Sequence, residues 1–188
     1  RAGDAHGAEQ WFDRMVGADL RPDEASYSCV INACAREGLV TRAEEWLGRM
    51  LSASVRADRV SYTSVVAACA QACQVDRAAR WMEQMVSDRV GVDEVSYNSI
   101  LSACAQTGEV EAAEQWLGRM LHAGVEASVV GYNCVIDAHA RGGDVEKAEQ
   151  WFERMREAGM EADGVTYGCL INACAKEAQV EKAEEWLR

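Results

Sequence analysis

Hydrophobic and aromatic positions along this chain recur with a fixed period of 35 residues. Aromatic residues mark the period most clearly, because their spacing holds without a single insertion. The tyrosines are Tyr27, Tyr62, Tyr97, Tyr132 and Tyr167, and the tryptophans are Trp11, Trp46, Trp81, Trp116, Trp151 and Trp186. A fixed period of this size is typical of a solenoid, in which one supersecondary unit is copied and stacked.

Each period contains two segments whose apolar residues fall at three- and four-residue intervals, the spacing of one helix face. In the first segment these residues are Tyr97, Ile100, Leu101, Cys104 and Ala105, and in the second they are Val110, Ala113, Trp116, Leu117 and Met120. Between the segments stands a glycine in three copies (Gly38, Gly108 and Gly143), which indicates a helix C-cap and a tight turn, and Cys73 or Ala178 in two others. No segment alternates like a strand, so each period predicts an αα-hairpin and the fold class is all-α.

We expect one continuous array over residues 1–188. The tyrosine alignment gives four full repeats and a partial repeat at each end: 24–58, 59–93, 94–128 and 129–163, flanked by 1–23 and 164–188. The chain begins and ends inside a repeat, and we expect it to be a fragment of a longer protein. No run approaches the length of a membrane span.

The eight cysteines follow the same period. One repeat position holds Cys34, Cys69, Cys104 and Cys174, with His139 as its fifth member, and another holds Cys29, Cys134 and Cys169. Neighbouring helices lie about 8–10 Å apart, too far for successive members to share a zinc ion. Cys69 and Cys73 form at most a weak ligand pair, so we expect structural thiols in a reducing compartment, with no metal and no cofactor.

Residues 95–120 read VSYNSILSACAQTGEVEAAEQWLGRM, which strongly resembles a pentatricopeptide repeat. The resemblance covers the whole chain, and the period of 35 residues differs from the 34 of tetratricopeptide repeats. It implies a right-handed α-solenoid of stacked helical hairpins. It also implies binding of single-stranded RNA, one base per repeat, in the RNA processing, stability or translation of a mitochondrion or chloroplast.

By this resemblance, two side chains read each base: the residue after the tyrosine and the last residue of the repeat. The pairs in this sequence are Ser28 with Asp58, Thr63 with Asp93, Asn98 with Ser128, and Asn133 with Asp163. The family's pattern then implies a preference for 5′-GGCU-3′. An alternative stays open for these residues, since Ser, Thr, Asn and Asp also cap helices for purely local reasons.

The resemblance assigns further roles. It implies that a base is sandwiched by Ala25, Val60, Val95, Val130 and Val165, for which ordinary packing is the alternative, and that phosphates are met by Arg36, Arg141 and Lys176. We assign the tyrosines and tryptophans to the core and expect Trp46, Trp81, Trp116 and Trp151 to be buried between hairpins.

A net charge of −12 argues against nucleic-acid binding, which ordinarily involves a basic surface. The charge is unevenly distributed, however. The five first-helix segments carry four basic and three acidic residues, a net charge of +1, which leaves −13 for the second helices and loops. The alternative function is therefore an acidic α-solenoid scaffold for protein–protein interaction. The sequence shows no nucleophile–base–acid set and no phosphate-binding loop, so we do not expect an enzyme.

Overall fold

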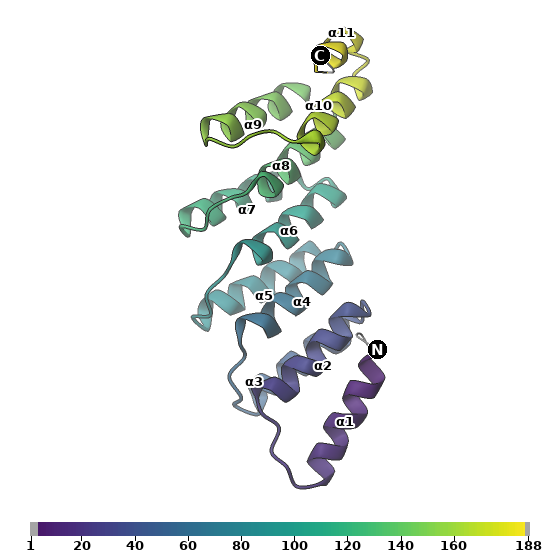
Figure 1. Ribbon diagram of the computed structural model, residues 1–188, viewed down its shortest axis with the longest axis vertical. Coiled ribbons are helices and arrows are strands. Elements are labelled where there is room, and N and C mark those ends of the chain that lie inside the picture. The colour runs from purple at the N-terminus through teal and green to yellow at the C-terminus, as the bar shows by residue number, and fades with distance from the viewer. Residues whose placement is uncertain (1–3, 187–188) are drawn as a thin grey trace. The chain divides into compact units, whose positions relative to one another are not determined.

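The computed structural model describes residues 4–186, and the side chains of all of these except Glu185. These residues form α-helices joined by short turns, with no strand among them (Figure 1). The helices are α1 (Ala5–Gly17), α2 (Glu24–Arg36), α3 (Val40–Ser52), α4 (Arg59–Gln71), α5 (Val75–Ser87), α6 (Glu94–Thr107), α7 (Val110–His122), α8 (Val129–Gly142), α9 (Val145–Glu157), α10 (Gly164–Lys176) and α11 (Val180–Trp186). The all-α class expected from the periodicity is confirmed. The outermost residues of both expected partial repeats lie outside the described residues.

Two compact units divide the chain between Val92 and Asp93. In the first unit, α2 packs against α1, α3 and α4, and α4 packs against α5. In the second, α8 packs against α6, α7, α9 and α10, and α10 packs against α11. Within each unit the even-numbered helices therefore lie side by side, each with its hairpin partner beside it (Figure 1).

Each even-numbered helix begins where a repeat was expected to begin, because the residue before it has an extended backbone that ends the preceding loop. Asp58, Asp93, Ser128 and Asp163 are four of these N-cap residues, with ψ between 173° and 178° in the extended region. At the other end, Gly38, Gly108 and Gly143 have positive φ, as the C-cap prediction requires. Cys73 and Ala178 take the same left-handed conformation with φ of 56° and 54°.

The recurring cysteine position lies in the core. Cys34, Cys69, Cys104 and Cys174 are fully buried, and His139 is 1% exposed. Burial raises the pKa of the Cys69 thiol to about 12, so this group stays protonated and unreactive at neutral pH. The second cysteine position is less uniform than expected, because Cys29 is exposed and Cys134 only half-buried.

The expectation that four tryptophans are buried is only half right. Trp46 and Trp116 are buried, whereas Trp81 and Trp151 are partly exposed. The indole hydrogen bond does not account for this difference, because buried Trp46 also donates its Nε1–H to a glutamate, Glu9, at 2.9 Å. The Nε1 atom of Trp81 donates to Glu44 at 2.8 Å, and that of Trp151 donates to Glu114 at 3.0 Å.

The terminal copies depart further from the core assignment. Trp11 is 69% exposed and Tyr167 is 39% exposed. An arginine three residues further on covers the ring of most of these tryptophans, with Arg14 5.0 Å from the Trp11 ring centroid and Arg119 4.6 Å from that of Trp116. No helix in the described part of the chain has the length and apolar character needed to cross a membrane.

Candidate nucleic-acid interface

The first expected base-reading pair is brought together in the first unit. Ser28 lies in the first turns of α2, and Asp58 is the N-cap of α4. The Ser28 Oγ atom lies 3.5 Å from Asp58 Oδ1 and 2.7 Å from the hydroxyl of Ser61. Ser61 in turn donates to Asp58 Oδ1 at 2.6 Å, so that a buried hydroxyl links the two members of the pair.

The corresponding pair in the second unit is in direct contact. Asn133 on α8 donates its Nδ2–H to Oδ1 of Asp163, the N-cap of α10, at 3.0 Å. The Oδ1 atom of Asn133 accepts from the hydroxyl of Thr166 at 2.7 Å. Asn133 is 7% exposed, so its amide is held at the bottom of the junction between α8 and α10.

The pair of Asn98 with Ser128 is held less tightly. The Nδ2 atom of Asn98 donates to Glu94 at 3.1 Å and reaches the Ser128 hydroxyl only at 3.5 Å. Ser128 is the N-cap of α8 but its side chain makes no capping hydrogen bond. Thr63 and Asp93 belong to different units, and within its own unit Asp93 accepts from the backbone and hydroxyl of Ser96 at 3.0 and 2.8 Å.

Helix capping, the alternative for these residues, is also present in the structure. Asp58, Asp93 and Asp163 all accept the backbone N–H of the third helical residue. Among the described residues, every hydrogen bond to the side chain of Asp163 falls on Oδ1, which leaves Oδ2 available. The backbone N–H of Thr166 lowers the pKa of Asp163, so that this available oxygen belongs to an ionised carboxylate at neutral pH. Capping and ligand contact are therefore compatible in one side chain.

Beside each pair lies an exposed apolar residue. Val60, Val95, Val130 and Val165 expose between 52% and 60% of their surface, and Ala25 is exposed as well. These valine side chains are therefore not part of the buried core. A repeated apolar group next to a polar pair is suited to the face and the edge of a planar base.

The expected phosphate contacts lie at the far ends of the same helices. Arg36 is exposed at the end of α2. Arg141 forms an ion pair with Asp137 at 2.8 Å, and the ammonium of Lys176 donates to the backbone carbonyl of Arg141, also at 2.8 Å. Lys176 and Arg141 therefore lie together in the second unit. Asp137 partly neutralises the charge of Arg141, whereas Lys176 bonds a neutral carbonyl and keeps its full charge.

Sequence reasoning missed two groups of residues. One is the buried hydroxyl at the third position of these helices, Ser61 and Thr166, whose partners lie 33 residues earlier in the chain. The other is a polar hollow of about 280 Å³ beside Asp58, lined among others by Arg56, Arg59 and Arg89. Ser or Thr at four of five copies of the third position was a signal for the first group, whereas the arginines of the second follow no period.

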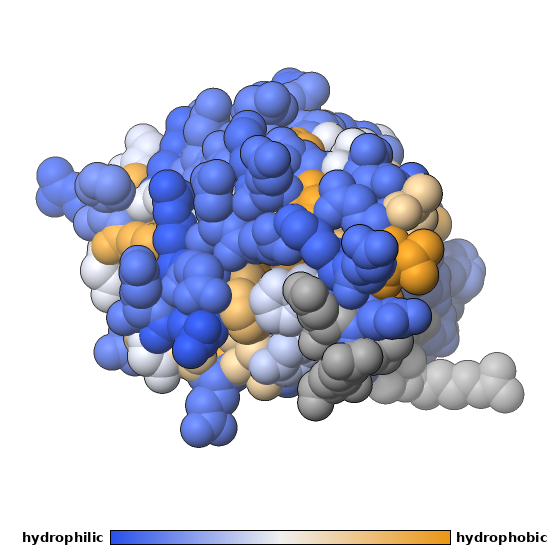
Figure 2. All heavy atoms as spheres, turned by 90° about the horizontal axis from the view of Figure 1, so that it is seen from above, coloured by the Kyte–Doolittle hydropathy of each residue, from blue (hydrophilic) through white to orange (hydrophobic). Residues whose placement is uncertain are grey.

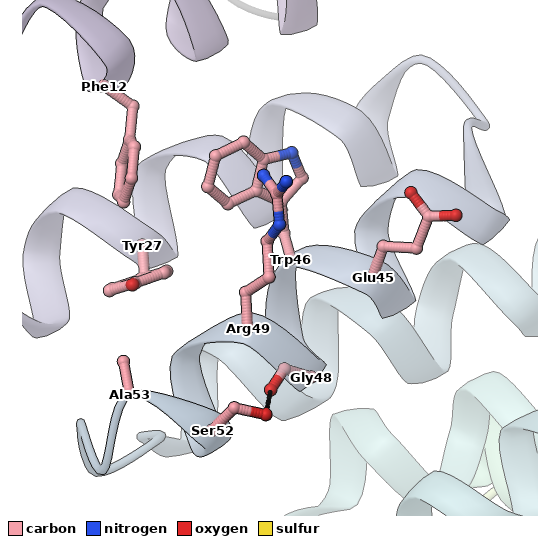
Figure 3. A pocket seen from close by; sticks show the side chains of 8 residues that line it. All are labelled: Phe12, Tyr27, Glu45, Trp46, Gly48, Arg49, Ser52 and Ala53. Carbon is pink, nitrogen blue, oxygen red and sulfur yellow. Dashed lines mark hydrogen bonds between the residues drawn. The ribbon is translucent and has the colours of Figure 1, made fainter. Parts of the chain in front are cut away.

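A larger hollow lies apart from the polar pairs. It has a volume of about 760 Å³ and is lined by residues of the first unit, the aromatic ones Phe12, Tyr27 and Trp46 beside the polar ones Glu45, Arg49 and Ser52 (Figure 3). The guanidinium of Arg49 lies over the Trp46 ring at 4.7 Å. Elsewhere, hydrophilic residues dominate the face seen in Figure 2, and hydrophobic ones stand mostly singly. No group of three potential metal ligands occurs among the residues that the structure describes.

Helical hairpins repeating every 35 residues, with a polar pair at the junctions between neighbouring hairpins within each unit, define an α-solenoid of the repeat class. The family model described as the pentacotripeptide-repeat region of PRORP matches residues 1–128, and two models of the PPR repeat match residues 127–176 and 165–188. The chain belongs to the pentatricopeptide repeat family, as its sequence indicated.

Solved structures show the same fold. The crystal structure of nuclear proteinaceous RNase P 2 from Arabidopsis thaliana is similar over 89% of this chain and 38% of that one, with 18% identity and a TM-score of 0.76. The pentatricopeptide repeat protein PPR10 from maize is similar over 93% of this chain and 25% of its own, with 27% identity and a TM-score of 0.72. The PPR domain of Arabidopsis thaliana protein-only RNase P 1, solved in complex with tRNA, is similar over 87% of this chain and 86% of that one, with 18% identity and a TM-score of 0.75. No curated protein matches the chain.

Proposed function

We propose that this chain binds single-stranded RNA along its even-numbered helices, with one base held at each junction between repeats. The observation that carries the proposal is the row of exposed valines, each directly after the N-cap turn that holds the polar pair. Stacking on an apolar side chain is available to every base, and the adjacent polar pair then distinguishes the base edges.

The chemistry of the pairs supports different bases at different junctions. An ionised aspartate oxygen accepts hydrogen bonds and therefore favours a base whose pairing edge presents a ring N–H, which is guanine or uracil. Ser28 with Asp58 would accept from the two donor groups of guanine. Asn133 can donate its remaining N–H to a uracil carbonyl while Asp163 accepts the ring N–H. Thr63 with Asp93 offers the same chemistry as Ser28 with Asp58 and is also assigned guanine. Ser128, a neutral hydroxyl, suits cytosine, and the proposed order along the array is therefore GGCU.

Relatives support the same partner. PPR10 has been solved in complex with an 18-nt psaJ RNA element, and RNase P 1 in complex with tRNA. The chain spans about two fifths of RNase P 2 and a quarter of PPR10, so their full activities do not pass to it. We propose no catalytic role for the repeats, and we propose an organellar location, in a mitochondrion or chloroplast, with a part in RNA processing, stability or translation.

Charge sets the expected strength of binding. Arg36, Arg141 and Lys176 are the cations placed for phosphates, and three contacts imply a slope of about −2 in log K against log salt. The competing function, an acidic scaffold for basic proteins, is favoured by a hollow of about 540 Å³ on α9 lined mainly by Glu146, Glu149, Glu153 and Glu157. We still propose RNA binding, because this acid lies on a second helix, and we expect modest affinity, because the base-reading aspartates add negative charge beside only three cations.

The test is a titration of the chain with three nucleic acids. They are a single-stranded RNA containing GGCU, the same RNA with these four bases in reverse order, and the GGCU strand paired with its complement. Val130→Ala should weaken binding of the GGCU strand several-fold through lost stacking. Val86→Ala is the matched control, since Val86 is equally exposed, at 58%, but lies on α5. Equal affinity for all three nucleic acids, or equal effects of the two valine changes, would favour the scaffold.

A further inference from the structure

A buried hydroxyl stands behind the polar pair at two of the repeat junctions. Ser61 and Thr166 are the third residues of α4 and α10, and both are fully buried. Neither side chain can touch solvent or a ligand directly. Each nevertheless bonds both members of the pair in front of it, one of which lies on the preceding even-numbered helix.

At the junction of α8 and α10 this hydroxyl fixes the amide of Asn133. Thr166 Oγ1 accepts the backbone N–H of Asp163 at 3.1 Å and lies 2.7 Å from Asn133 Oδ1 and 2.9 Å from Asp163 Oδ1. With Oδ1 bonded to the hydroxyl and Nδ2 bonded to Asp163, turning the Asn133 side chain over would break the hydroxyl's bond to Oδ1 and set Oδ1 against the Asp163 carboxylate. Its second N–H is then held in one direction.

At the junction of α6 and α8 the same position is Gly131, which has no hydroxyl to offer. The Oδ1 atom of Asn98 is buried there and has no hydrogen-bond partner among the described residues. A Cβ atom added at Gly131 would lie 3.2 Å from this oxygen, with Asn98 Oδ1 as its nearest neighbour. The space of the missing hydroxyl thus adjoins the buried Asn98 oxygen that lacks a donor.

We propose that the hydroxyl at the third position of a repeat orients the residue that follows the tyrosine of the preceding repeat, and so sets the base selectivity of that junction. Thr166 is a positioning residue for Asn133, and Ser61 is one for Ser28. Gly131 leaves the amide of Asn98 without this constraint, and the junction of Asn98 with Ser128 discriminates less among bases. The selectivity part of the proposal rests on the RNA binding proposed above.

The first experiment removes the hydroxyl while keeping the shape of the side chain. Thr166→Val is compared with Thr166→Ser in the full chain, against four RNAs that differ only at the base facing Asn133 and Asp163. We expect Thr166→Val to reduce the preference for uracil five- to tenfold, as loss of one oriented hydrogen bond implies, and Thr166→Ser to retain it. An unchanged preference in Thr166→Val, with helical content intact, would overturn the proposal.

The second experiment adds the hydroxyl where it is missing. Gly131→Ser should raise the discrimination at the third base at least threefold. Gly142→Ser, on the same helix with nothing within 4 Å of the added Cβ atom, is the control and should leave all four bases ranked as before. If Thr166→Val fails to fold, this arm decides, and equal results for the two serine variants would then count against the proposal.

A third measurement needs no RNA and separates this inference from the proposed function. The side-chain amide of Asn133 is observed by NMR in the free protein. In Thr166→Val its two N–H signals should move towards the positions of an asparagine amide that is free to turn about its Cβ–Cγ bond. In Thr166→Ser they should stay. If the signals do not move, the orienting role is wrong whatever RNA does. If they move but the parent chain ranks no base, the positioning is correct and the proposed RNA readout is what fails.

Discussion

Asn98 and Asn133 follow equivalent tyrosines in consecutive repeats of the second unit, and their amides meet different surroundings. Asn133 has a partner on each side, a carboxylate for its N–H and a hydroxyl for its oxygen. Asn98 donates to Glu94 on its own helix and has only a long contact with the Ser128 hydroxyl, and its buried oxygen has no partner among the described residues. The same residue at the same repeat position is therefore fixed in one junction and weakly held in the next. The difference comes from the following repeat, which supplies an N-cap aspartate and a threonine in one case and a serine and a glycine in the other.

The largest expected effect concerns what the fixed amide recognises. Asn133→Thr should move the preference at the fourth base from uracil towards guanine, because the amide donor is replaced by a shorter hydroxyl as in the pair of Thr63 with Asp93. A hydrogen-bond mismatch of about 1–3 kcal/mol corresponds to roughly a ten- to hundredfold change in affinity. Titration of four RNAs that differ only at this base measures it. Identical ranking by both proteins would leave these residues as helix caps alone.

The same comparison predicts unequal costs of removing each amide. Asn133→Ala removes two hydrogen bonds at the base of the junction, one to Asp163 and one to the buried Thr166 hydroxyl, and should destabilise the chain by about 1–3 kcal/mol. Asn98→Ala removes an oxygen that already lacks a partner, together with one bond to Glu94 on the same helix and a long contact with Ser128, so its cost should be smaller, below about 1 kcal/mol. Urea unfolding of the two variants gives the values. Equal losses would mean that the buried oxygen of Asn98 is satisfied in solution.

The positions of the helices could be predicted from the sequence because they depend on local signals. Apolar spacing defined the hairpins, and the aspartate or serine before each even-numbered helix marked its first residue. Local signals failed at one turn position. Cys73 and Ala178 adopt the left-handed conformation there although neither is glycine.

The polar network behind the pairs could not be predicted for a different reason. Thr166 and Asn133 lie 33 residues apart, and only the packing of α10 on α8 brings them to 2.7 Å. The indole hydrogen bonds of Trp81 and Trp151 are also tertiary, because the glutamates that accept them, Glu44 and Glu114, lie 37 residues earlier in the chain. A hydrophobic pattern shows which face is apolar, but not which member of that face has a polar edge to satisfy.

A smaller effect should distinguish the two N-caps. Asp163 accepts the backbone N–H groups of both Val165 and Thr166, whereas the Ser128 side chain caps nothing. Asp163→Ala should therefore cost about 1–2 kcal/mol, and Ser128→Ala less than about 0.5 kcal/mol. Hydrogen exchange of the first turns of α10 and α8 locates each loss, with Asp163→Ala accelerating exchange at Thr166. Comparable acceleration at the start of α8 in Ser128→Ala would show that Ser128 does cap that helix in solution.

The smallest predicted effect is a pH dependence confined to one junction. The pKa of Asp163 is lowered, first by the backbone N–H of Thr166 and further by the Thr166 hydroxyl and Asn133. An acid whose pKa is lower in the folded chain stabilises that fold above its unfolded pKa of about 4, and the contribution disappears as the pH falls through the folded pKa. Hydrogen exchange at the start of α10, corrected for its intrinsic pH dependence, should therefore quicken below about pH 4 relative to the start of α8. Asp163→Asn removes the titrating group and should abolish this difference, whereas Ser128→Asn, at the N-cap that carries no acid, should leave it unchanged. A difference that persists in Asp163→Asn would assign the pH dependence to other acids of the second unit.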